Sequence, residues 1–143
     1  MRIKTILREF VPLLLVILLV MTFFRVIPDR KIAATCAGLL FVLVPLALMV
    51  LRWKEGGPGF SRGPRTLWWT GVLQFWLLFA LPILGARLLF WETAFEEFTF
   101  FGQSGADWHR YSSKSYMLML LLILASHGWA WAQMTAAQKQ KAS

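Results

Sequence analysis

The sequence predicts an all-α integral membrane protein whose four transmembrane helices form two antiparallel hairpins. First, 58% of the 143 residues are apolar and 15% are charged, whereas about a quarter of the residues in a soluble domain are charged. Second, the apolar residues gather into four runs, each close to the roughly 20 residues that a helix needs to cross a bilayer. Third, the runs are continuous, while barrel strands are shorter and alternate. The length predicts a single transmembrane domain over residues 1–143.

Each apolar run defines one predicted span. The spans cover residues 10–27, 32–51, 67–91 and 115–134. A short connection around Pro28 separates the first two, so we expect a tight turn there. The connection between the second and third spans is rich in Gly and Pro and should be irregular. No small-x-small cleavage site precedes a soluble mature chain, so we expect the first span to be retained.

The connection over residues 92–114 alternates acidic with aromatic side chains. An amphipathic segment of this kind lies in the headgroup plane or folds back on the mouth of the helix bundle. We therefore expect it to be ordered. Phe98 and Trp108 are its predicted interface anchors, because aromatic side chains carry much of the binding energy at protein interfaces.

Positive charges in the short connections predict the orientation. With the N-terminus inside, nine Lys and Arg residues lie on the inner side and six on the outer side. This bias predicts a bacterial inner-membrane protein with both termini in the cytoplasm. The net charge of +8 is then explained by helix anchoring and by contact with anionic lipid headgroups, rather than by nucleic-acid binding.

Three polar side chains are candidates for a role within the membrane: Gln74, Ser126 and His127. Gln74 and His127 are both seven residues from the predicted inner ends of their spans, or about 10 Å at 1.5 Å per residue. This matched depth predicts that their side chains pair between helices, either as an interhelical contact of about 1 kcal/mol or as part of a path. We expect no Asp, Glu or Lys deep in any span, which disfavours an ion-coupled transporter.

A second set of candidates lies at the outer face and could bind a ligand. Its members are Arg25, Arg87, Glu92, Glu96, Glu97, Asp107, His109 and Arg110. The carboxylates and the imidazole are possible ligands of a hard or borderline metal, and the two arginines near helix ends could bind an acidic ligand or extend to the headgroups. We favour the simpler interpretation, in which the acids are solvated and pair with neighbouring cations. No metal or cofactor is predicted, and the lone Cys36 excludes a disulfide framework.

The sequence contains no evident catalytic constellation, which favours a non-enzymatic protein. The leading hypothesis is an accessory or assembly subunit that packs on another membrane protein, on a second copy of itself, or on lipid. The first alternative is a small transporter or channel component with a path near Gln74 and His127. The second is a membrane-embedded enzyme that acts on a lipid through the acidic outer connection.

Overall fold

The computed structural model describes residues 3–54, 61–94, 97 and 99–142. Its elements in chain order are α1 (Ile3–Val26), α2 (Arg30–Lys54), α3 (Arg62–Phe75), the π-helical segment η1 (Trp76–Ala80), α4 (Leu81–Leu89), β1 (Thr99–Phe100), β2 (Gln103–Ser104) and α5 (Gly105–Ala142). Within the described residues, four helices are long and apolar enough to cross a membrane, the third of them formed by α3, η1 and α4 together. The part of the chain that the structure describes is therefore all-α apart from one two-stranded hairpin.

These helices extend beyond the predicted spans at most of their ends, although the third ends at Leu89 rather than at residue 91. The first begins at Ile3 rather than residue 10, and the last covers Gly105–Ala142 rather than 115–134. The reason is physical: hydropathy marks the part of a helix that would meet hydrocarbon, whereas backbone hydrogen bonds continue into polar flanks. Helix bounds alone do not locate the edges of a bilayer, so the span limits remain predictions.

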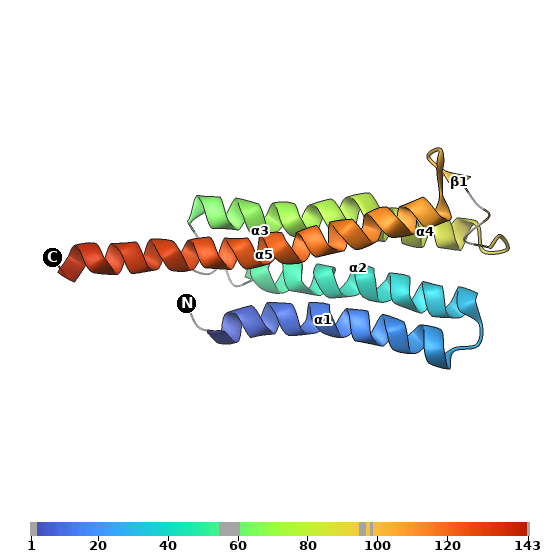
Figure 1. Cartoon of the computed structure of the whole chain (residues 1–143), viewed down its shortest axis with the longest axis horizontal. Helices are drawn as coiled ribbons and strands as arrows, with labels where there is room; N and C mark the ends of the chain where they lie inside the picture. The colour runs from blue at the N-terminus through green and yellow to red at the C-terminus, as the bar shows by residue number, and fades with distance from the viewer. Residues whose placement is uncertain (1–2, 55–60, 95–96, 98, 143) are drawn as a thin grey trace.

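The long helices lie side by side along the long axis of the molecule, with both termini at one end (Figure 1). α1 packs chiefly on α2 and α3 chiefly on α5, while α2 also contacts η1 and α4. The turn between α1 and α2 is short because Asp29 caps α2: its carboxylate accepts hydrogen bonds from the backbone N–H groups of Lys31 and Ile32, at 2.8 and 3.3 Å. α5 continues past the other helices at its C-terminal end (Figure 1).

Apolar side chains fill the interior and also cover much of the exterior. Leu13, Val16, Met119 and Ile123 are fully buried, yet large apolar residues on the outer faces are widely exposed, such as Leu18 at 59%. A helix that is hydrophobic on all sides belongs in a membrane or in a large protein core. The outer surface is therefore suited to lipid or to other membrane helices.

Glycines allow α3 and α5 to approach closely. A Cβ atom on Gly71 would lie 2.9 Å from the Cβ of Leu122, and one on Gly63 would lie 2.7 Å from the ring of Trp129. Small residues at helix contacts are typical of membrane bundles, where backbone proximity supplies the packing energy. These two contacts fix how far α3 and α5 slide along each other.

The π-helical segment η1 interrupts the third long helix just before Pro82. The backbone N–H of Leu81 donates to the carbonyl of Trp76, five residues earlier. Proline lacks an N–H and its ring collides with the preceding turn, and a widened turn relieves that conflict. The indole N–H of Trp76 also donates to the carbonyl of Val42 at 2.9 Å, which joins η1 to α2 three residues before Pro45.

Candidate functional site

The main buried polar cluster is built around Glu9, which is not one of the candidates predicted from the sequence. Its side chain is nearly inaccessible, with the residue 3% exposed. Glu9, Leu13 and Val16 are all buried and are spaced at i, i+4 and i+7, so they form one face of α1 that points into the bundle. Glu9 lies one residue before the first predicted span, so the expectation that no Asp, Glu or Lys lies deep in a span stays a prediction.

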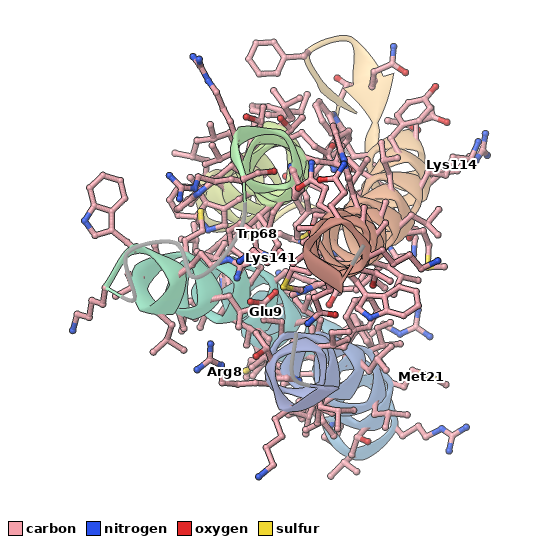
Figure 2. The ribbon with its side chains drawn as sticks, turned by 90° about the vertical axis from the view of Figure 1, so that its left-hand side faces the viewer. Arg8, Glu9, Met21, Trp68, Lys114 and Lys141 are labelled. Atoms are coloured by element: carbon pink, nitrogen blue, oxygen red, sulfur yellow. The ribbon has the colours of Figure 1, made fainter. Side chains whose placement is uncertain are left out.

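Four residues, one from each long helix, make up this cluster, which we call the Glu9 quartet: Glu9, Arg52, Trp68 and His127. Oε1 of Glu9 is 3.1 Å from Nη1 of Arg52. Oε2 accepts the indole N–H of Trp68 at 2.8 Å and lies 2.8 Å from Nε2 of His127. In the view along the helices, Glu9 and Trp68 lie between the four helices (Figure 2).

The three partners of the Glu9 carboxylate belong to three different helices. Arg52 is in the last turn of α2, where a cation is favoured by the helix dipole. Its guanidinium carbon lies 4.7 Å from the centroid of the Trp68 ring, which adds a cation–π contact. Trp68 and His127 are themselves buried at 1% and 0% exposure. All four residues lie at the end of the bundle that carries the termini.

The contacts match an ionised carboxylate. Trp68 can only donate, and arginine is permanently charged and has only N–H groups to offer. His127 can also donate to this carboxylate when a hydrogen is on Nε2, and that placement follows from the network rather than from an observed hydrogen. With the carboxylate ionised, the charges of Glu9 and Arg52 cancel. Such pairing is what a buried charge requires, since an isolated one is very costly in an apolar medium.

The quartet is a packed cluster rather than a substrate cavity. A shallow pocket of the described structure lies elsewhere, and its lining includes Arg62, Thr66 and Trp129. It contains no member of the quartet. The geometry of the quartet therefore permits two roles, which are to hold four helices in register or to exchange a proton between Glu9 and His127.

The predicted pairing of Gln74 with His127 is wrong. Gln74 instead bonds Ser115: its Oε1 accepts from the Ser115 hydroxyl at 2.7 Å, and its Nε2 donates to the Ser115 carbonyl at 3.1 Å. His127 is twelve residues further along α5. Ser126 is buried and donates to the carbonyl of Ile123 within its own helix. The depth estimate failed because the contacts of Gly63 and Gly71 set a different register between α3 and α5.

Among the described residues, the candidates predicted at the outer face do not converge on one site. Arg25 is exposed, Arg87 is half-buried, and Glu92 lies 3.7 Å from Lys31 across the ends of α4 and α2. Glu97 is exposed, whereas Glu96 and Phe98 are outside the described residues. Among the residues with a described placement, no group of three or more His, Cys, Asp and Glu side chains is arranged to hold a metal ion.

The polar residues at the start of α5 make contacts that stabilise the helix end and the hairpin before it. Asp107 accepts from the Ser104 hydroxyl at 2.7 Å and its backbone N–H donates to that hydroxyl at 3.2 Å, which caps the helix. Arg110 is 3.7 Å from Asp107 and His109 is exposed. Trp108 donates from its indole to the carbonyl of Phe100 at 2.7 Å. Trp108 therefore anchors the hairpin of β1 and β2 to the bundle.

Comparison with known proteins adds no family. No protein-family model, curated protein or solved structure matches this chain. The class that the described fold defines is a chain with four apolar helices long enough to cross a membrane.

Proposed function

We propose that the protein is a small bacterial inner-membrane protein that acts as an accessory or assembly subunit of a larger membrane complex. One observation carries the proposal: the buried polar side chains make their contacts within the bundle, while large apolar side chains on the outer faces are exposed. The buried polar residues of the described structure are Glu9, Arg52, Ser115, Ser126 and His127. Each has contacts within the bundle.

In this proposal the quartet acts as a clamp, by which we mean that its polar contacts hold the four long helices in a fixed arrangement. α1 packs mainly on α2 and only slightly on α5. The Glu9 carboxylate connects it to α3 and α5 as well, and the Tyr116 hydroxyl adds a second link by donating to the carbonyl of Leu13 at 2.7 Å. A subunit needs a fixed outer shape in order to be recognised, and polar contacts between membrane helices supply such fixed geometry.

The orientation in this proposal places the quartet near the cytoplasmic face. Both termini lie at the quartet end (Figure 1), and Lys4, Lys54, Arg62 and Lys139 belong to helix ends on that side. Cationic residues are enriched on the cytoplasmic side of membrane proteins. The hairpin formed by β1 and β2 then faces the outside, and anionic headgroups are the lipid partners at the inner surface.

Photo-crosslinking in native membranes tests the subunit role. A photoreactive amino acid is placed at the outward-facing Leu18, Leu77 or Leu121, which are more than half exposed, and at the buried Ile123 as a matched control. We expect one outward face to give a discrete protein adduct, either with a second copy or with another membrane protein, and Ile123 to give none. Lipid adducts alone on every outward face would contradict a subunit role.

A small transporter is the second candidate, because Glu9 and His127 place two titratable groups in contact inside the bundle. Proton-coupled membrane proteins use such buried pairs. Purified protein in liposomes would then move protons, Glu9→Gln would abolish the movement, and the exposed Glu92→Gln would preserve it. Equal proton movement in protein-free and protein-containing liposomes would contradict this candidate.

A further inference from the structure

The tip of the outer hairpin has an unusual residue for its backbone conformation. β1 and β2 pair Thr99 with Ser104 and Phe100 with Gln103, which leaves a two-residue turn. Phe101 has φ +51° and Gly102 has φ +71°. Positive φ at both central positions characterises a type I′ turn, for which Asn-Gly is strongly preferred. A bulky aromatic residue rarely adopts positive φ.

Phe101 is also highly exposed, with 82% of its surface accessible. The hairpin below it is held firmly, because the carbonyl of Phe100 accepts from Trp108 and the two rings are 5.7 Å apart. The Trp108 ring in turn meets Phe79 edge-on at 6.0 Å. The Phe101 ring meets the Phe100 ring edge-on, with the centroids 4.5 Å apart, but most of its surface stays exposed. A strained and exposed aromatic residue on an anchored support indicates a functional constraint.

The hairpin projects sideways from the end of the bundle opposite the termini, at a steep angle to the helix axes (Figure 1). The end-on view also shows it reaching beyond the ring of helices (Figure 2). If the helices cross a bilayer along their length, a segment in this direction runs along the membrane surface. Phe90 and Trp91, which follow α4 at the same end, are both 39% exposed and resemble the aromatic belt at a membrane interface.

We propose that Phe101 inserts into the outer leaflet of the lipid bilayer and anchors the hairpin at the level of the headgroups. The inference rests on the proposed membrane insertion. Lipid is favoured over a protein partner because the neighbouring Thr99, Gln103 and Glu97 are exposed and polar. The exposed Phe101 ring, which lies against Phe100 and is flanked by these polar side chains, is too small for a stable protein interface, which buries about 800 Å² per partner. It suits the boundary between headgroups and acyl chains.

Spin labelling in phospholipid vesicles tests this inference. With Cys36 replaced by Ala, a nitroxide is attached at Phe101→Cys, at Gln103→Cys in the same hairpin, or at Leu18→Cys in the middle of α1. Accessibility to oxygen reports lipid, and accessibility to a water-soluble nickel chelate reports water. We expect the label at 101 to resemble the one at 18, with an oxygen-to-nickel ratio severalfold above that at 103.

A second measurement keeps Phe101 itself in the protein. The label at 103 is compared in the Phe101 background and after Phe101→Asn, a change that suits the turn. We expect faster motion and higher nickel accessibility at 103 in the Asn variant.

The possible outcomes separate the inference from the proposed function. Water accessibility at 101 with lipid accessibility at 18 overturns the anchoring alone. Water accessibility at 18 overturns membrane insertion as well. Protection of 101 from both reagents indicates a protein contact and also overturns anchoring by lipid.

Discussion

Truncating the Glu9 side chain should greatly destabilise the bundle. Glu9→Ala removes the acceptor of contacts from three other helices and leaves Arg52 charged and only 4% exposed. Removing one partner of a buried ion pair costs about 3–5 kcal/mol, because the remaining charge stays buried after its counter-charge is lost. Since about 1.4 kcal/mol corresponds to a factor of ten, we expect the folded-to-unfolded ratio to fall by more than a hundredfold.

The free energy of unfolding can be measured by titrating denaturing detergent into micelles and following helix content. The matched control is Glu92→Ala, because the Glu92 side chain is 92% exposed and lies 3.7 Å from Lys31. Such a surface pair contributes at most about 1 kcal/mol. A double variant, Glu9→Met with Arg52→Met, should lose less unfolding free energy than the two single variants lose together, since neither charge then remains buried after losing its counter-charge. If Glu9→Ala costs no more than Glu92→Ala, the quartet is not a clamp.

Other predictions follow from the helix contacts and the hairpin. Gly71→Val should lower the free energy of unfolding by about 1–3 kcal/mol, because the larger side chain forces α3 away from α5. Gly85→Ala should be neutral or slightly stabilising, because its Cβ would have no neighbour within 4 Å. Equal effects of the two changes would contradict the close approach of α3 and α5 at Gly71. In a cysteine-free background, an impermeant thiol reagent added to intact cells should label Ser104→Cys and spare Lys139→Cys, and the reverse would refute the orientation. Trp108→Ala should speed hydrogen exchange of the hairpin amides, and an unchanged rate would show that the indole is no anchor.

The helices were predictable from sequence because hydropathy is a local property. Each apolar run is nearly continuous, so its helix could be located without knowing what it packs against. The ends were less certain, because the polar turn that contains Glu9 is helical without being apolar. The spacing of Glu9 with Leu13 and Val16 did carry a signal, since these three positions share one helix face.

The quartet could not be derived in the same way. Glu9 and Trp68 are 59 positions apart and Glu9 and His127 are 118 apart, so their contact depends on how helices slide and rotate against one another. The failed pairing of Gln74 with His127 shows this directly. It assumed a common inner boundary for two helices, whereas the glycine contacts determine the offset. The tip residue Phe101 was missed because Phe-Gly is not a typical turn signal.

The chain order of the quartet has a consequence for how the protein is made. Glu9 and Arg52 belong to the first two helices, so their charges can neutralise each other before the third helix emerges from the ribosome. Trp68 arrives next and His127 last. An acidic side chain that enters the bilayer alone is costly, and early pairing with Arg52 lowers that cost during insertion. The packing of α1 is complete only after α5 has been made. In a chain that stops before its last helix, Glu9 would lack its contact with His127.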